Sequence, residues 1–279
     1  MNRSPSREDL PSETLATLRA DWDAFAALFE ERMEPVTRQT ARTLLLQLRL
    51  SEADALLEVG AGAGGAAREA RELLRPGARH VVTDLSAEMV RRARRKLPAA
   101  AEVHEADAQA LPFADASFDR YLSNLNLMLV PDADAALAEA ARVLVSGGHA
   151  AWCVWGRPEH SPLFTLPAQA AERVGLTPAT KQRSNFYLGE RGALRERVAR
   201  HGFRDVLAWY QPMPVPVPSA EAFARSVLGT PRWERALQDR THQERESLER
   251  TLEELARARL ERGLPIQLEA LLVVATRGP

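Results

Sequence analysis

The stretch Glu58-Val59-Gly60-Ala61-Gly62-Ala63-Gly64-Gly65 lies between a short apolar segment, 55–59, and a segment that begins a helix. Glycines at such a junction permit a tight turn and let a ligand approach the backbone closely. The pattern alone is weak, because Gly60, Gly62 and Gly65 also fit the dinucleotide-binding fingerprint, and an ordinary strand-to-helix turn has the same composition. The surrounding residues must decide which ligand the loop serves.

The chain around this loop alternates between short apolar runs and helical periodicity. Helices are expected at 86–96 and 132–145. Alternation at this spacing is typical of an α/β fold with a doubly wound parallel sheet. The runs that we expect to be strands are 55–59, 81–84, 103–107, 120–123, 149–155, 204–210 and 266–276.

Both ends of the chain differ from this alternating core. Residues 1–13 are polar and predict a loose tail, and 14–49 have helical spacing, so 1–50 is expected to form a tail and helical cap before a domain at 51–279. Alternating prolines at 212–218 lack backbone donors, which confines that piece to a sheet edge or a connector. Residues 219–262 are charged and helical, which indicates a helical insertion before the last strand.

Three carboxylates follow the expected strands. Asp84 ends the second strand, where it can accept both ribose hydroxyls of a bound nucleoside. Glu58 ends the first strand, where it would repel a pyrophosphate at the adjacent helix N-terminus and suits a ligand with an ammonium and a sulfonium group. Asp107 follows the third strand and can accept a hydrogen bond from an adenine amino group. The set favours S-adenosylmethionine over a dinucleotide.

Five motifs in this order resemble the class I S-adenosylmethionine-dependent methyltransferases, in particular the small-molecule branch that includes the ubiquinone/menaquinone-biosynthesis enzymes. The resemblance covers residues 20–156 well and the final strand more loosely, and implies a seven-stranded Rossmann-like sheet and S-adenosylmethionine as cofactor. The motifs that carry it are Glu58 to Gly64 with Asp84, Asp107-Ala108, Leu111-Pro112-Phe113, Ser117-Phe118-Asp119 and Leu144-Val145-Ser146-Gly147-Gly148.

The resemblance also implies the residues that hold the cofactor. Gly60, Gly62 and Gly64 would form the loop beneath its methionine part. Asp84 would bind the ribose, and the remaining implied contacts are Leu85 on the adenine face, Asp107 on the adenine amino group, the Ala108 amide on a ring nitrogen, and Ser123 and Asn124 near the ammonium.

The acceptor side is less determined. Leu127 and Met128 stand where many relatives carry histidines, which predicts an apolar acceptor pocket without that general base. His160 is the best-placed titratable residue for proton removal, although a solvent-exposed loop histidine would look the same. Further candidates for this pocket, each equally compatible with simple packing, are Trp22, Trp155 and Tyr187.

Composition excludes several classes of protein. The chain has 279 residues, 37 Lys+Arg, 38 Asp+Glu and 45% hydrophobic residues, so disorder is excluded and no general charge attracts nucleic acid or anionic membrane. The scattered histidines and the single Cys153 predict no metal site. The absence of an apolar leader or membrane-spanning segment predicts a cytoplasmic protein. A homo-oligomer is compatible with the sequence. Two alternatives stay open: a nicotinamide-dependent oxidoreductase, and a cofactor-binding regulatory protein without catalysis.

Overall fold

The computed structural model describes residues 12–176 and 184–279; the N-terminal tail expected at 1–13 lies almost entirely outside these residues. The described chain forms two compact units. One contains residues 12–155, Tyr187–Gln211 and Ala270–Pro279, and the other contains Gly156–Phe186 and Pro212–Glu269.

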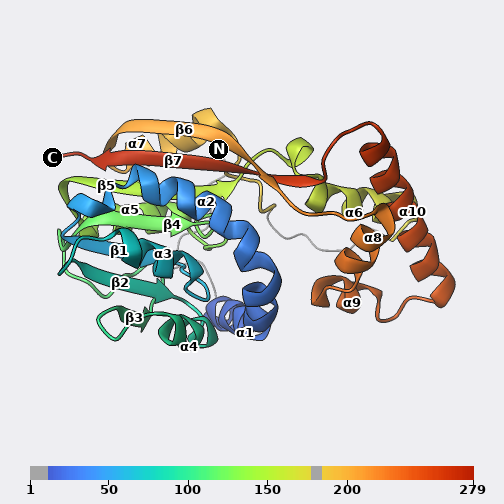
Figure 1. Cartoon of the computed structure of the whole chain (residues 1–279), viewed down its shortest axis with the longest axis horizontal. Helices are drawn as coiled ribbons and strands as arrows, with labels where there is room; N and C mark the ends of the chain where they lie inside the picture. Colours follow the sequence, from blue (N-terminus) through green and yellow to red (C-terminus); the bar gives the residue numbers. More distant parts are fainter. Residues whose placement is uncertain (1–11, 177–183) are drawn as a thin grey trace. The chain divides into compact units, whose positions relative to one another are not determined.

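Seven strands form one sheet in the order β3-β2-β1-β4-β5-β7-β6 (Figure 1). Neighbouring strands from β3 to β5 are parallel, and β7 runs antiparallel to β5. This arrangement confirms the predicted doubly wound seven-stranded sheet. The strands are β1 Ala55–Val59, β2 Arg79–Asp84, β3 Glu102–Glu105, β4 Phe118–Asn124, β5 Leu144–Trp155, β6 Phe203–Pro214 and β7 Gln267–Arg277.

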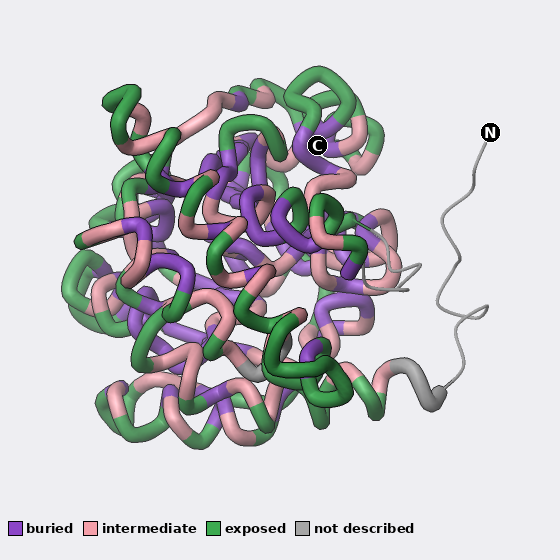
Figure 2. Tube along the Cα trace, turned by 90° about the vertical axis from the view of Figure 1, so that its right-hand side faces the viewer, coloured by how far each residue is buried: buried purple, intermediate pink, exposed green. Residues whose placement is uncertain are grey.

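The central strand β1 pairs with both β2 and β4, and four of its five residues are buried. A parallel strand covered on both faces reads as a continuous apolar run, which explains the sequence Ala-Leu-Leu-Glu-Val. Buried segments of the chain are purple in Figure 2. Because β1 lies in the middle of the parallel part of the sheet, the loop that follows it opens at the carboxyl edge, where ligands bind in this architecture.

Helices connect the strands of the first unit, and polar caps set several of their starts. Ser86 accepts a hydrogen bond from the Met89 amide at the start of α4, and Asp132 accepts two at the start of α5. The helices of this unit are α1 Ser12–Leu28, α2 Glu34–Gln47, α3 Gly65–Leu73, α4 Ala87–Lys96, α5 Ala133–Val143 and α7 Arg191–Arg200, with the 3₁₀ turn η3 Leu50–Glu52.

The predicted helix at 14–49 is one continuous helical segment with a change of pitch. A five-residue π-helical stretch, η2 Phe29–Met33, joins α1 to α2, and Pro35 stands in the first turn of α2, where it needs no amide hydrogen. Ala26 of α1 packs in a buried cluster with Ala63 of the glycine loop and Met89 of α4. This segment thereby contacts the glycine loop.

The second unit is helical. Its helices are α6 Pro162–Arg173, α8 Ala220–Leu228, α9 Pro231–Leu237 and α10 His242–Glu261, preceded by the 3₁₀ turn η4 Pro158–His160. Their apolar faces share one buried core that includes Leu166, Phe223, Leu248 and Leu252. The expected insertion at 219–262 contains α8 to α10, whereas the sequence pattern did not indicate α6, whose interior holds Pro167.

The bounds of several strands differ from the expectation, β3 and β5 most clearly. β3 ends at Glu105, so Asp107 lies in a short bridge with Ala110 rather than in the strand. β5 begins at Leu144 and contains Gly147, because its pairing with β4 shifts register there and a glycine tolerates the bulge. The proline-rich β6 occupies an edge of the sheet, as predicted.

Candidate active site

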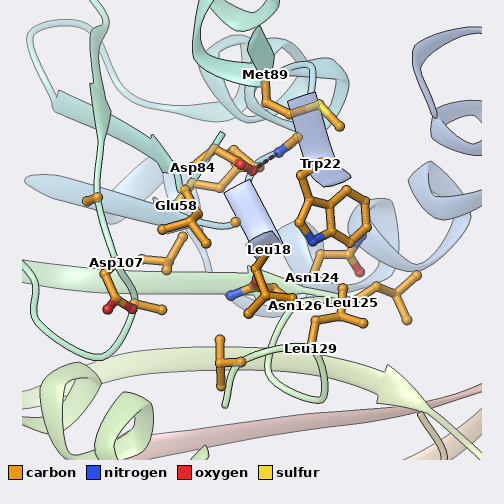
Figure 3. Close-up of a pocket in the computed structure, with 18 of the residues that line it drawn as sticks. Leu18, Trp22, Glu58, Asp84, Met89, Asp107, Asn124, Leu125, Asn126 and Leu129 are labelled. Carbon is orange, nitrogen blue, oxygen red and sulfur yellow. Dashed lines mark hydrogen bonds between the residues drawn. The ribbon is translucent and has the colours of Figure 1, made fainter. Parts of the chain in front are cut away.

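One pocket of the first unit opens at the carboxyl ends of β1, β2 and β4 (Figure 3). Its wall combines the glycine loop with side chains from the cap helices α1 and α2. The residues expected from the sequence that line it are Trp22, Glu58, Gly60, Gly62, Asp84, Leu85, Asp107, Ala108 and Asn124.

The glycine loop has a backbone that only glycine adopts easily. Gly60, Gly62 and Gly64 have φ angles of 68°, 59° and 84°, in the left-handed region that side chains disfavour. A Cβ on Gly60 would lie 2.3 Å from the Asn126 side chain, and one on Gly62 would lie 2.7 Å from the ring of Phe29. The loop therefore needs glycine both for its conformation and for close approach of neighbouring groups.

Asp84 holds this loop in place from the end of β2. Its carboxylate accepts hydrogen bonds from the Gly62 amide (2.8 Å) and the Ser86 amide (3.0 Å). Burial raises the pKa of Asp84 to about 6, although these amides oppose the rise. The residue thus links the glycine loop to the start of α4 and presents its carboxylate to the pocket (Figure 3).

Glu58 is almost wholly buried, with 2% of its surface exposed, and lines the pocket. Its Oε2 makes no hydrogen bond to any described residue and lies 3.9 Å from Nε2 of His80, which is fully buried in β2. Burial raises the pKa of Glu58, while His80 acts in the opposite direction. A buried carboxylate oxygen without a donor indicates a place for a cationic or donor group of a ligand.

Asp107 lies in the loop after β3 and lines the same pocket. Its Oδ1 accepts hydrogen bonds from the amide and the side chain of Gln109, each 2.9 Å long. Gln109 in turn accepts a hydrogen bond from the Asp132 amide at the start of α5 (2.9 Å). This chain of contacts fixes Asp107 at the carboxyl edge although it stands outside the strand.

The end of β4 is tied to α2. The Asn124 side chain accepts a hydrogen bond from Thr40 (2.8 Å) and donates one to the Thr37 carbonyl (3.1 Å). Leu125 then adopts a φ of 54°, unusual for a branched side chain, and its amide donates to the Cys153 carbonyl (2.9 Å). The Asn124 amide group is therefore engaged in holding the cap, and Leu125 redirects the chain along the pocket wall.

Trp22 of α1 was a candidate from the sequence, whereas no local pattern indicated the pocket residues that α2 contributes. Glu34 accepts a hydrogen bond from the Gly65 amide in the first turn of α3 (2.9 Å) and pairs with Lys96 (2.6 Å). Arg38 also lines the pocket and binds the Glu69 carboxylate. Their positions result from packing of the helical segment onto the glycine loop, which no local motif encodes.

Several expected residues do not line this pocket. Ser123, Leu127, Met128 and Trp155 are buried with 1%, 2%, 2% and 6% exposure, and Gly64 packs against the Ala93 backbone. Tyr187 belongs to the first unit but is also absent from the lining. The apolar wall after β4 comes instead from Leu125 and from Leu129, Val130 and Pro131 further along.

His160 lies in η4 of the second unit, with its Nδ1 4.0 Å from Oε2 of Glu269. Arg157 binds the same carboxylate with two side-chain hydrogen bonds of 2.9 and 2.7 Å. Arg157 is thus used in an ion pair within this unit, and a catalytic role for His160 stays a prediction.

Two features are absent from the described part of the chain. Its His, Cys, Asp and Glu residues form no group of three that could hold a metal ion. No described helix has the length and apolar character that crossing a membrane requires.

Comparison with known proteins identifies the family. A family model described as a methyltransferase domain matches residues 57–152. The malonyl-[acyl-carrier protein] O-methyltransferase of Geobacter sulfurreducens is 32% identical over 210 residues, which cover 75% of each chain. The ubiquinone/menaquinone biosynthesis C-methyltransferase of Bradyrhizobium diazoefficiens is 39% identical over 98 residues, 33% of this chain and 39% of that one.

An uncharacterized protein of Mycobacterium tuberculosis is 35% identical over 151 residues. The match spans 52% of each chain, so it covers about half of that relative's length. Among solved structures, the methyltransferase bound to the Trm112 activator of Haloferax volcanii has a TM-score of 0.61 at 22% identity, covering 94% of this chain and 97% of that one. This likeness confirms the fold. The relative matched over three quarters of its length and the matching methyltransferase domain confirm the resemblance predicted from the motifs: the chain belongs to the S-adenosylmethionine-dependent methyltransferase family.

Proposed function

We propose that this chain transfers a methyl group from S-adenosylmethionine to an oxygen, nitrogen or carbon atom of a small, partly apolar acceptor. The observation that carries the proposal is the grouping of Glu58, Asp84 and Asp107 around the glycine loop in one pocket (Figure 3). Each carboxylate stands at the carboxyl edge of a different strand, and β1, β2 and β3 are neighbours in the sheet, which suits an elongated nucleoside ligand.

The residues present fit this cofactor. The unpartnered Glu58 oxygen suits the ammonium of its methionine part, and the glycine backbone permits close approach of that part. Asp84 would accept the ribose hydroxyls and Asp107 the adenine amino group, while Leu85 offers an apolar face to the ring. These assignments follow the donor and acceptor chemistry of the pocket.

The pocket does not suit a nicotinamide dinucleotide. A dinucleotide places its pyrophosphate at the N-terminus of the helix that follows the glycine loop. In this chain the Glu34 carboxylate already accepts the Gly65 amide at that position, and Glu58 adds a second negative charge nearby. A phosphate would meet two carboxylates where it needs donors, which argues against the oxidoreductase alternative.

Bound there, the cofactor would supply an electrophilic methyl group. Leu18 and Trp22 from α1 and Leu129 after β4 surround the pocket with apolar surface, which excludes water and favours an apolar acceptor (Figure 3). The lining carboxylates are engaged in holding the loop or the cofactor, so we expect alignment and exclusion of water to contribute most of the acceleration.

The decisive experiment is calorimetry with S-adenosylhomocysteine, S-adenosylmethionine and NADH under identical conditions. We expect binding of both adenosyl ligands and none of NADH; NADH binding with no heat from S-adenosylhomocysteine would refute the proposal. Methyl transfer is then measured over an acceptor panel, beginning with acceptor oxygens because the relative matched over 75% of its length is named an O-methyltransferase. Cofactor binding without turnover on any acceptor would favour a regulatory protein.

A further inference from the structure

A buried pair of titratable side chains adjoins the pocket, and the proposed cofactor contacts use only one of them. Glu58 lines the pocket, whereas His80 does not. The two are 2% and 0% exposed, and 3.9 Å separates His80 Nε2 from Glu58 Oε2. Glu58 Oε2 has no hydrogen-bond partner among the described residues, and the same holds for both ring nitrogens of His80.

The fold itself brings these two side chains together. Glu58 of β1 is in register with Val82 of β2, and Leu56 is in register with His80. Alternate residues of a strand point to the same face, so Glu58 and His80 emerge side by side from the same face of neighbouring strands. Their proximity is therefore a property of the sheet register rather than of one side-chain rotamer.

Burial restricts the charge that this pair can carry. An ionised Glu58 beside a neutral His80 would leave a net negative charge in the interior, which is costly without a compensating partner. One shared proton removes that net charge, whether it sits on the carboxylate or on the imidazole. Glu34 disfavours ionisation of Glu58 further. The charged groups that line the pocket besides Glu58, from α2, β2 and the loop after β3, are Glu34, Arg38, Asp84 and Asp107.

We propose that Glu58 and His80 together hold one proton when the pocket is empty and release it to water when a ligand ammonium group binds beside Glu58. The ammonium supplies the positive charge that the proton supplied before, so Glu58 becomes a carboxylate paired with the ligand and His80 stays neutral. No covalent bond changes, and the only product besides the complex is one hydrogen ion. The inference rests on the proposed cofactor site and adds a coupling of cofactor affinity to pH.

The test is calorimetry of S-adenosylhomocysteine binding at about pH 7.5 in two buffers with small and large ionisation enthalpies, such as phosphate and Tris. We expect a net release of protons on binding, at most one per bound ligand, and affinity that rises with pH by up to about tenfold per pH unit. Asp84 is ionised at that pH, because its pKa is about 6, and therefore adds little. Clear binding with equal heats in both buffers would overturn the proton coupling and leave the cofactor site standing, whereas absence of binding would overturn the proposed function.

Variants assign the proton to the pair. Glu58→Gln should weaken binding and abolish the release, because no carboxylate remains to ionise. His80→Asn keeps a polar side chain but removes the basic site, so fewer protons should be released per bound ligand at the same pH. His104→Asn in β3, where the side chain is 47% exposed, is the matched control and should behave like the parent. Unchanged proton release in a folded His80→Asn variant would place the proton on Glu58 alone and refute the role of His80.

Discussion

Asp84 offers the sharpest test of the site, because it has a structural contact and a proposed ligand contact on the same carboxylate. Asp84→Asn preserves the size of the side chain but replaces one acceptor oxygen with a donor. That donor would face either the Gly62 amide or the Ser86 amide, which now donate at 2.8 and 3.0 Å. A hydrogen bond to a charged group contributes about 1.5–3 kcal/mol. Loss of one such bond to the ribose should weaken S-adenosylhomocysteine binding by roughly 10- to 150-fold.

The assay is calorimetry at about pH 7.5 on the parent, Asp84→Asn and Asp84→Ala, with Asp54→Asn as a matched control. Asp54 stands before β1 at the opposite edge of the sheet and is 74% exposed, so the same substitution there should leave affinity unchanged. Asp84→Ala loses both acceptor oxygens and should bind about 2–4 kcal/mol more weakly than the parent. If both Asp84 variants bind like the parent, the ribose assignment is wrong.

The raised pKa of Asp84 adds a dependence on pH with a defined sign. The ionised carboxylate accepts ligand hydroxyls, so affinity should decline as the pH falls below about 6, by at most about tenfold per unit. Stability of the empty protein changes in the opposite sense. Because burial raises the folded pKa from 3.8 to about 6, the contribution of Asp84 is fully present below about pH 3.8 and declines as the pH rises through 6. The decline is at most about 3 kcal/mol, and urea unfolding of Asp84→Asn should lack it.

The sequence predicted those parts of the site that local signals encode. Glu58, Asp84 and Asp107 each follow an apolar run that a turn interrupts, and strand ends of a parallel sheet meet at one edge. Their convergence on one pocket therefore required only the order of the strands. The role of the glycines was also predictable from a local signal, because a tight strand-to-helix turn requires positive φ angles such as those of Gly60 and Gly62.

The remainder depends on tertiary packing that leaves no local signal. Glu34 is one of many charged residues in a helical stretch, and only the placement of α2 on the glycine loop brings it to the Gly65 amide. The pocket wall after β4 differs from the expectation: Leu127 and Met128 are buried outside the pocket, whereas Leu125 and Leu129 line it. Leu125 has a left-handed φ, which has no signature in the sequence.

Three further predictions concern turnover, the glycine loop and the cap. His160→Ala should lower turnover by less than about tenfold without changing cofactor affinity, whereas a loss of about 10²–10⁴ would identify a general base. Gly62→Ala should lower the melting temperature more than Gly77→Ala, although both glycines have a positive φ. A Cβ at Gly62 would lie 2.7 Å from a ring atom of Phe29, whereas nothing lies within 4 Å of a Cβ at Gly77. Equal losses would show that the clash costs nothing. Of the two contacts that Glu34 makes, with Lys96 and with the Gly65 amide, we expect the second to hold the cap, since Oε1 accepts that amide at 2.9 Å. Glu34→Gln keeps an acceptor oxygen there, whereas Glu34→Ala leaves the amide unpaired in a buried place, which costs about 1–3 kcal/mol. The free energy of unfolding in urea should therefore be similar for the parent and Glu34→Gln and clearly lower for Glu34→Ala. If Glu34→Gln is as unstable as Glu34→Ala, the charge of Glu34 holds the cap on the glycine loop, rather than its hydrogen bond to the α3 N-terminus.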